Sequence, residues 1–254
     1  MSKIVLESKD LCKTYILDKY SNNVLKNVNF ILKEGEFVSI MGPSGTGKST
    51  LLNTLSGMDN ASFGRIIFDG EEMSNMNPKQ MSNLRLNKMG FVFQQMYMLK
   101  KLCILDNIVL PGYQAAKMKK SEVNERARKL MHNLGIEDIA QNEITEVSGG
   151  QLQRACICRA LINSPKVLFA DEPTGALNSK ASAEVMNVLR KANSEGTTIL
   201  MVTHSEKVAA SSERVIFLVD GNIKGELNLG RQTDENDSSI RERKLKNWLD
   251  EMGW

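Results

Sequence analysis

The sequence predicts an α/β fold built on a mainly parallel β-sheet, with an antiparallel β subdomain at the N-terminus and an α-helical subdomain inserted into the core. Three observations lead to this prediction. Two strand-like runs open the chain, at residues 4–15 and 24–32. A short apolar strand at residues 36–41 then runs into a glycine-rich loop that is followed by a helix. Further along, apolar strands alternate with helices, which is typical of a parallel sheet.

The N-terminal runs are separated by a polar segment, residues 18–23, which predicts a turn between two antiparallel strands. The helix after the glycine-rich loop is expected from Lys48 to Ser56, because Gly57 is a typical residue at a helix C-terminus. The first part of the chain therefore has the order antiparallel pair, core strand, loop and helix.

Residues 78–135 have a mostly helical pattern. Asn77 is a suitable capping residue, and Pro78 fits the first helical position. Two interruptions of the helical pattern are predicted, at residues 90–94 and at residues 110–112, where proline and glycine disfavour a helix interior. We expect the inserted helical subdomain to span about residues 95–163.

The remaining core elements follow in alternation: a helix from Gly149 to Ile162, strands at 167–170, 198–202 and 214–219, and a helix at about 179–195. Residues 1–229 are assigned to one domain, and residues 230–254 to a polar linker and a short amphipathic helix. In that helix apolar residues recur at helical spacing beside basic ones. It either rests on a membrane surface or a regulator, or it packs back on its own domain; we favour the second because short amphipathic helices usually cover a core.

Composition is that of an ordinary globular protein, with 254 residues, 41% hydrophobic and 25% charged. The formal net charge of +3 creates no global field that favours a nucleic acid, so we expect no nucleic-acid partner. Charge interrupts the N-terminus too early for a signal peptide, and no apolar run approaches a membrane-spanning length. The sequence therefore predicts a cytoplasmic protein.

Four cysteines, at positions 12, 103, 156 and 158, are expected to stay reduced in such a protein. Cys156 and Cys158 invite a metal interpretation, but residues two apart on a helix point to different faces. We interpret both as small buried residues of a packed helix.

The glycine-rich loop matches the pattern G-x-x-x-x-G-K-[ST]. Glycines let the backbone turn so that several N–H groups face one concavity, and the following helix adds its positive N-terminus. Such a concavity fits a polyphosphate, with Lys48 reaching the β- and γ-phosphates and the Ser49 hydroxyl ligating Mg²⁺. This predicts a P-loop NTPase core with ATP and Mg²⁺ as cofactors. The predicted nucleotide-binding residues of this segment are Gly42, Pro43, Ser44, Gly45, Thr46, Gly47, Lys48, Ser49 and Thr50.

Two adjacent carboxylates, Asp171 and Glu172, follow the apolar strand at residues 167–170. They emerge at the C-terminal end of a parallel strand, where ligands bind in α/β sheets. Asp171 is predicted to hold Mg²⁺ through water, and Glu172 to orient and polarise the attacking water. With the glycine-rich loop, this pair predicts ATP hydrolysis.

A second small-residue turn, Ser148, Gly149, Gly150 and Gln151, opens a helix without a lysine of its own. Placed just upstream of the acidic pair, it resembles the signature motif of the ATP-binding-cassette (ABC) family. The resemblance covers about residues 15–219, with every family landmark in order. It implies that these four residues complete the nucleotide site of a second subunit, in a head-to-tail homodimer with ATP sandwiched at the interface.

The resemblance also implies three single-residue roles. Tyr15 would stack on adenine, Gln94 would contact Mg²⁺ and the attacking water, and His204 would hydrogen-bond the γ-phosphate. The implied catalytic set is thus Glu172, His204 and Gln94, and the implied metal ligands are Ser49, Gln94 and Asp171. One position departs from the family pattern: Asn178 stands where an aspartate is usual, which bears on communication between the two sites rather than on nucleotide binding.

The finer resemblance is to the bacterial macrolide-export, lipoprotein-release and bacitracin-resistance ATPases, on Pro173-Thr174-Gly175 and the segment 93–111. Residues 175–180 look most like those of the branch that confers resistance to antimicrobial peptides. This resemblance implies a role in antibiotic resistance. A chain with one cassette and no membrane span then needs a separate transmembrane permease, which would hold it at the inner face of the cell membrane. The expected function is an ATPase that drives export or release of a hydrophobic or antimicrobial-peptide-type substrate.

Two alternatives stay open at this point. Residues 96–102 lie where the family docks the permease, but their methionine and leucine content fits an ordinary core equally well. The chain also resembles membrane-associated ABC ATPases of the cell-division type, which transport nothing and transmit force to a partner.

Overall fold

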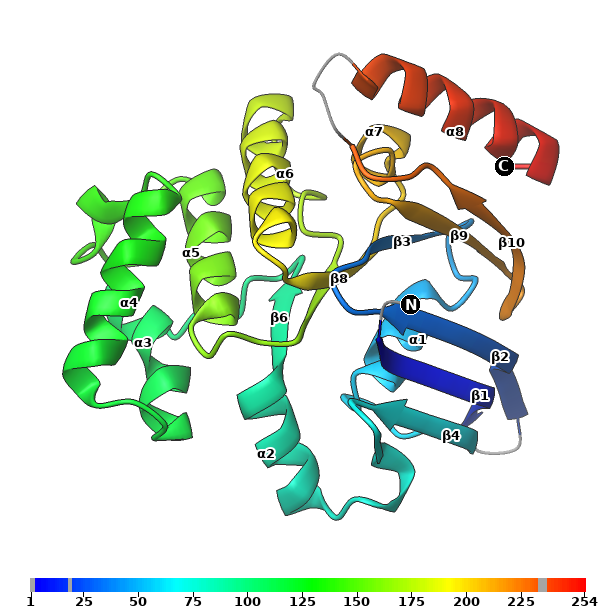
Figure 1. Cartoon of the computed structure of the whole chain (residues 1–254), viewed down its shortest axis with the longest axis horizontal. Helices are drawn as coiled ribbons and strands as arrows, with labels where there is room; N and C mark the ends of the chain where they lie inside the picture. The colour runs from blue at the N-terminus through cyan, green and yellow to red at the C-terminus, as the bar shows by residue number, and fades with distance from the viewer. Residues whose placement is uncertain (1–2, 18–19, 233–236) are drawn as a thin grey trace. The chain divides into compact units, whose positions relative to one another are not determined.

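Strand β3 (Phe37–Met41) is buried along its whole length and forms the centre of the first of two units of the chain (Figure 1). The computed structural model describes residues 3–17, 20–232 and 237–254. One unit comprises Met1–Met81 together with Thr198–Trp254, and the other comprises Ser82–Thr197. Each unit has its own paired strands and its own buried core.

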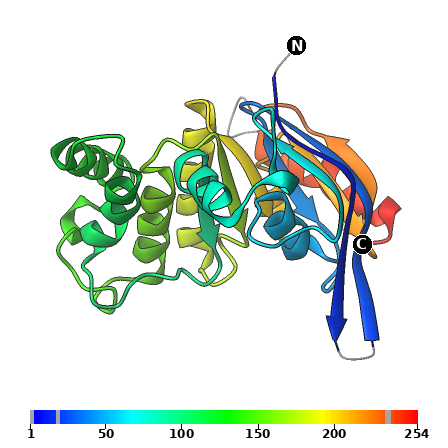
Figure 2. The ribbon, with the colours of Figure 1, turned by 90° about the horizontal axis from the view of Figure 1, so that it is seen from below.

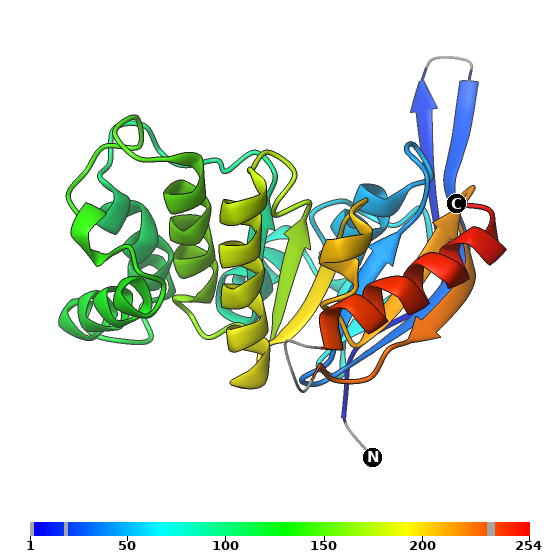
Figure 3. The same ribbon diagram turned by 90° about the horizontal axis from the view of Figure 1, so that it is seen from above.

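An antiparallel sheet forms the N-terminal part of the first unit, with strand order β2-β1-β4-β5. Its strands are β1 (Ile4–Leu17), β2 (Tyr20–Lys33), β4 (Phe63–Phe68) and β5 (Glu71–Glu72). Strand β1 pairs with β4 from Leu6 to Cys12, and it pairs with β2 as far as Leu17 opposite Tyr20. Figures 2 and 3 show β1 and β2 side by side along their length. The predicted N-terminal antiparallel β subdomain is therefore present.

The turn predicted at residues 18–23 is wrong for residues 20–23, which belong to β2. Asn23 pairs with Thr14, and the Thr14 hydroxyl donates to Asn23 Oδ1 at 2.6 Å. This part of β2 is exposed, so its polar side chains stay in contact with water. Pairing with β1 provides hydrogen-bond partners for its backbone N–H and C=O groups. Residues 18 and 19 of the predicted turn lie outside the described residues.

The second sheet segment of the first unit places β3 between two parallel neighbours, β8 (Thr198–Val202) and β9 (Arg214–Val219). Strand β10 (Asn222–Asn228) pairs antiparallel with β9. Both β3 and β8 are buried at every position, as expected for central parallel strands. Helix α1 (Lys48–Leu55) follows β3, and the short α7 (Glu206–Ala209) follows β8.

Helix α8 (Ser238–Met252) packs its apolar side against its own unit (Figure 3). Leu245 and Leu249 are fully buried, and Trp248 meets Phe217 edge to face with ring centroids 6.2 Å apart. Arg241 is also buried and donates to the carbonyl oxygens of Ala210, Ser212, Leu229 and Gly230. Of the two interpretations of this helix, packing on its own domain is the one that the structure supports.

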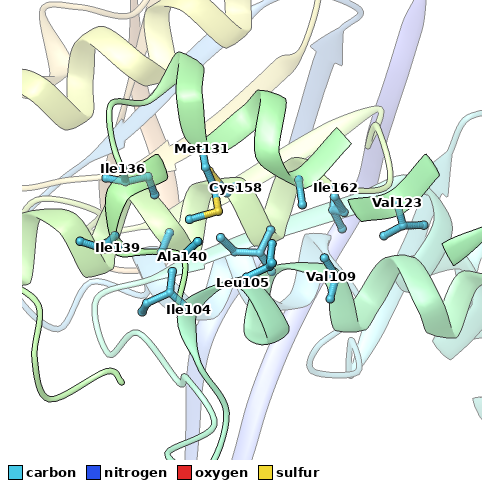
Figure 4. Packing of buried hydrophobic residues seen from close by; sticks show 13 residues of the cluster. Ile104, Leu105, Val109, Val123, Met131, Ile136, Ile139, Ala140, Cys158 and Ile162 are labelled. Carbon is cyan, nitrogen blue, oxygen red and sulfur yellow. The ribbon is translucent and has the colours of Figure 1, made fainter. Parts of the chain in front are cut away.

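The second unit contains the parallel pair β6 (Met89–Phe93) and β7 (Val167–Asp171) and most of the helices. The helices are α2 (Pro78–Lys88, which crosses the unit boundary), α3 (Ile104–Ala115), α4 (Lys120–Asn133), α5 (Gly149–Leu161) and α6 (Ser179–Ser194). Helices α3, α4 and α5 enclose one hydrophobic cluster (Figure 4). Its members include Ile108, Val123, Met131, Cys158 and Ile162. The limits of the helical subdomain, about residues 95–163, stay a prediction.

The interruption predicted at residues 110–112 is wrong, because α3 continues through Pro111. A proline inside a helix costs about 3 kcal/mol in lost hydrogen bonding and steric clash. A tertiary contact is made at this turn, where the Pro111 carbonyl accepts from Asn163 Nδ2 at 3.1 Å. A Cβ on Gly112 would lie 2.6 Å from Val123 Cγ1, so the glycine lets α3 and α4 approach closely.

Cys156 and Cys158 are fully buried in α5, which confirms their interpretation as packed helix residues. Burial raises the pKa of the Cys156 thiol to about 11 and raises the pKa of Cys158 as well. Both thiols are therefore neutral near pH 7, which suits an apolar interior.

Candidate nucleotide-binding site

The phosphate loop, residues 42–49, leaves the carboxyl end of β3 and continues into α1. Gly42 has a φ of 152°, and a Cβ there would lie 2.0 Å from the carbonyl oxygen of Leu218. Gly47 has a φ of 100°, and its Cβ would lie 2.9 Å from the carbonyl oxygen of Val24. Neighbouring backbone therefore requires glycine at both ends of the loop.

Lys48 is 9% exposed and places its ammonium group against the loop. Its Nζ donates to the carbonyl oxygens of Gly42 at 2.7 Å and Pro43 at 2.8 Å. The Thr46 hydroxyl also donates to the Pro43 carbonyl, at 3.0 Å. A positive charge is thus held in a defined place beside the loop backbone.

The N-terminus of α1 suits an anion. Its N-cap residue is Gly47, which makes no side-chain cap, and the first turn carries no acidic residue. The positive end of the helix dipole therefore meets no carboxylate of the helix itself. Together with Lys48, this arrangement fits the phosphate groups of ATP.

Strand register brings His204 close to the phosphate loop. Strands β3 and β8 are parallel, with Ile40 opposite Val202, and the Thr203 N–H donates to the Ile40 carbonyl at 3.2 Å. Gly42 and His204 each follow two residues after that pair, at the same edge of the sheet. His204 is exposed there.

Tyr15 lies in β1 and is tied to two charged residues of the same unit. Its hydroxyl donates to Asp59 Oδ2 at 2.6 Å, and Lys13 Nζ lies 4.7 Å from the centre of its ring. The hydrogen bond to Asp59 raises the pKa of Tyr15, while one with Thr50 lowers it, and the net shift is upward. Burial alone would raise the pKa of Asp59, but hydrogen bonds from Lys13 and Tyr15 outweigh it and lower that pKa.

The second unit brings Gln94 and Glu172 together. Strands β6 and β7 are parallel with Phe93 opposite Asp171, so the two residues that follow leave the same edge. A Cβ on Gly175 would lie 3.1 Å from Gln94 Nε2 and 3.2 Å from Glu172 Oε2, so both side chains converge there. Glu172 also has a φ of 46°, a left-handed conformation that is uncommon outside glycine and is found often at functional sites.

The signature turn, residues 148–151, is capped by its own side chains. Ser148 Oγ accepts from the Gln151 N–H at 3.3 Å, and Gln151 Oε1 accepts from the Ser148 N–H at 2.9 Å. This reciprocal pair is a capping box for α5. A Cβ on Gly150 would lie 3.0 Å from Ala181 Cβ, so this glycine lets α5 pack against the start of α6. Ser148 and Gly149 remain exposed, as a residue that binds a second subunit must be.

The structure also shows the local contacts of Asn178 and of the segment 96–102. Asn178 is the N-cap of α6, and its Oδ1 accepts from the Ala181 N–H at 2.9 Å. In the segment 96–102, Met98 packs against the helical cluster, whereas Tyr97 and Leu99 are 64% and 51% exposed. The core and surface interpretations of this segment thus apply to different residues.

The predicted magnesium ligands are Ser49 in one unit and Gln94 and Asp171 in the other. Within the parts of the chain that the structure describes, no group of three or more His, Cys, Asp and Glu residues has the arrangement of a metal site. Magnesium bound with ATP needs no such group, because phosphate oxygens and water fill most of its coordination shell. A hydroxyl, an amide and a carboxylate are hard oxygen donors that fit this ion.

Sequence reasoning missed Asp59 and the packing role of Gly150. Asp59 contacts residues that are 44 and 46 positions away in the sequence. A search for local spacing cannot find such a residue, although its position shortly after α1 marks it as part of the same segment as the phosphate loop.

A glycine-rich phosphate loop between a parallel strand and a helix defines a P-loop nucleotide-binding protein. A family model described as "ABC transporter" matches residues 25–175. The chain therefore belongs to the ABC transporter family, as the sequence motifs implied. In residues 3–17, 20–232 and 237–254, no helix has the length and apolar character to cross a membrane.

Curated relatives include export proteins. The macrolide export ATP-binding/permease protein MacB of Mannheimia succiniciproducens is 42% identical over 86% of this chain, which spans only 34% of the length of that protein. The bacitracin export ATP-binding protein BceA of Halalkalibacterium halodurans is 40% identical over 90% of both chains. The match to MacB is thus confined to part of a longer protein, whereas the match to BceA spans most of its length.

Solved structures with the same fold are cassettes. A dimeric structure of MJ0796, described as a bacterial ABC transporter cassette, has a TM-score of 0.83 and 40% identity, covering 88% of this chain and 98% of its own. A second dimeric structure of MJ0796, in a post-hydrolysis state with ADP and Pi, has the same TM-score with 39% identity and the same coverage. The predicted α/β fold with a P-loop core is therefore confirmed.

Proposed function

We propose that this chain is the ATP-hydrolysing subunit of an ABC exporter, acting as a head-to-tail homodimer on a separate membrane permease. The observation that carries the proposal is the pairing of one phosphate loop with one exposed signature turn in the same chain. The turn is capped by its own Gln151 and carries no lysine, so it is suited to complete a site rather than to form one. A two-fold dimer gives each loop the turn of the other copy.

The residues of the first unit bind the nucleotide. Lys48 pairs with β- and γ-phosphate oxygens, while the loop N–H groups and the N-terminus of α1 receive the rest of the phosphate charge. Tyr15 stacks on the adenine ring. His204 hydrogen-bonds the γ-phosphate from the adjacent strand end.

Hydrolysis uses the residues at the ends of β6 and β7. Glu172 accepts a hydrogen bond from the attacking water and orients it, and Gln94 beside it contacts the same water. Asp171, Ser49 and Gln94 are the residues that would hold Mg²⁺, and the ion would supply positive charge to the phosphate oxygens. Loss of the γ-phosphate contacts then lets the two copies separate.

The export assignment rests on the two related export proteins and on the sequence around residues 173–180. We assign the substrate to a hydrophobic or antimicrobial-peptide-type class, and place the chain at the inner face of the cell membrane, where a permease holds it. The permease contacts the substrate, and the exposed Tyr97 and Leu99 are where this chain meets the permease.

Glu172→Gln tests the hydrolytic role. We expect ATP affinity to be kept, the hydrolysis rate to fall by about 100-fold or more, and a stable ATP-dependent dimer to appear in light scattering. Glu195→Gln, a change at an exposed glutamate just after α6, is the matched control and keeps the wild-type rate. A Glu172→Gln protein that hydrolyses ATP at the wild-type rate contradicts the assignment.

Ser148→Arg tests the role of the signature turn in the second copy. In the Glu172→Gln background, we expect the ATP-dependent dimer to be lost while the affinity of the monomer for ATP is unchanged. Equal loss of both properties overturns the role in the dimer.

Purification from membranes tests the transport role. A tagged chain, isolated from detergent-solubilised membranes of its own host, is expected to carry a protein with several membrane spans that stimulates its ATPase activity. A purely soluble set of partners contradicts the exporter assignment.

A further inference from the structure

Asp59 is placed to control the orientation of Tyr15. It follows α1 and lies against β1, where one carboxylate oxygen accepts from the Tyr15 hydroxyl and the other from Lys13 Nζ, both at 2.6 Å. Lys13 also donates to the carbonyl oxygen of Asn60 at 2.7 Å. The two side chains of β1 are thus fixed by one short segment of chain.

We infer that Asp59 is a positioning residue for the nucleotide base, which holds the Tyr15 ring in the orientation that stacks on adenine. This inference deepens the proposed function and rests on the stacking role given there to Tyr15. Asp59 acts through Tyr15 and is not proposed to touch the nucleotide.

The backbone of Asp59 is anchored to the helix that begins at the phosphate loop. The N–H groups of Met58 and Asp59 donate to the carbonyl oxygen of Asn53 in α1, at 2.9 Å and 3.1 Å. The helix starts at Lys48, so one short helix joins the phosphate-binding lysine to the carboxylate that fixes the tyrosine. All of these residues belong to one unit, so the spacing between base platform and phosphate loop is set within it.

Lys13 determines which face of the Tyr15 ring is open to a nucleotide base. It is only 7% exposed, and its ammonium group lies over one face of Tyr15 at 4.7 Å. A base must therefore stack on the opposite face. Tyr15 is 39% exposed, which leaves ring surface for that contact.

The test compares ATP with inorganic tripolyphosphate, which has the phosphates but no base. We expect Asp59→Ala to weaken ATP binding about three- to tenfold in titration calorimetry and to leave tripolyphosphate binding unchanged, since an aligned ring contact accounts for about that factor. Glu7→Ala removes another carboxylate that pairs with a lysine of β1, and it is the matched control with both affinities unchanged. Asp59→Leu, which keeps a side chain of similar size but offers the Tyr15 hydroxyl no acceptor, provides a second variant if Asp59→Ala unfolds.

A double-mutant comparison shows whether Asp59 acts through the tyrosine hydroxyl. In a Tyr15→Phe background, the effect of the Asp59 change on ATP affinity is expected to shrink to less than half. An equal effect in both backgrounds, or parallel loss of ATP and tripolyphosphate binding, shows a general structural role and overturns the inference.

Tyr15→Ala separates this inference from the proposed function. If it lowers ATP affinity while the Asp59 variants do not, the stacking role stands and the positioning role is overturned. If Tyr15→Ala leaves ATP affinity unchanged, the stacking role itself is wrong, and the role of Asp59 is overturned with it.

Discussion

The phosphate loop and the signature turn both precede a helix and both contain glycine, but they are built differently. Each is a glycine-containing turn at the N-terminus of a helix, α1 in one case and α5 in the other. The first helix has Gly47 at its N-cap and no side-chain cap. The second has Ser148 there and a complete capping box with Gln151.

This difference fits the two roles proposed above, in which the phosphate loop binds an anion and the signature turn completes the site of a second copy. In the phosphate loop, Gly42 is required by contact with neighbouring backbone, and Lys48 is held by the loop carbonyls. In the signature turn, Gly149 has only an ordinary contact, 3.6 Å from Leu177 Cδ2. The first turn therefore carries a positive charge held by its own carbonyls, whereas the second is capped by its own side chains.

The largest expected difference between the two turns is in the free energy of unfolding when a glycine is replaced by alanine. Gly42→Ala should lower the free energy of unfolding by about 3 kcal/mol or more, because the Cβ collides with the Leu218 carbonyl and the φ is unfavourable. Gly149→Ala should change it by less than about 0.5 kcal/mol. Urea unfolding followed by circular dichroism measures both, and equal losses would show that the two turns are built alike.

Lys48→Ala should have the next largest effect, on nucleotide binding. Removing a charge-assisted contact to phosphate is expected to weaken ATP affinity by about 10- to 100-fold in titration calorimetry. Lys9→Ala, which removes an exposed lysine paired with Glu7, is the control and should bind ATP as the wild type does. Since the signature turn has no lysine, an unchanged affinity in Lys48→Ala would remove the main chemical difference between the two turns.

The motifs that the sequence reveals by itself consist of residues close together in the chain. The phosphate loop, the acidic pair and the signature turn are each recognisable from the spacing of a few neighbours. Buried strands such as β3 and β8 were also predictable, because burial on both faces leaves a continuous apolar run. Strands β4 and β10 are partly exposed and gave no such run.

The features that escaped prediction depend on distant contacts. Pro111 lies inside a helix and its carbonyl accepts from Asn163, 52 positions further along the chain, and Gly150 lies in a close approach to Ala181 in the next helix. Asp59 meets Tyr15 only once β1 lies beside the end of α1. Local propensity is a weak guide wherever such tertiary contacts decide the outcome.

The capping box predicts a smaller effect in the signature turn. Ser148→Ala removes the side-chain acceptor for the Gln151 N–H and should lower the free energy of unfolding by about 1 kcal/mol. The affinity of the monomer for ATP, measured by calorimetry, should not change. A Ser148→Ala protein as stable as the wild type would mean that Gln151 and the cap do not hold this turn, and that it resembles the phosphate loop after all.

The smallest effect is expected at Asn178, which extends the comparison to a third helix start. Its side chain caps α6 as Ser148 caps α5, and aspartate caps as well as asparagine does. Asn178→Asp, the usual family residue, should therefore change the free energy of unfolding by less than about 0.5 kcal/mol, with a small gain from the helix dipole. Asn178→Ala loses the acceptor and should cost about 1 kcal/mol in the same urea titration. If the aspartate variant is as unstable as the alanine variant, the hydrogen bond to Ala181 is not what fixes this loop, and the side chain at position 178 serves the dimer interface instead.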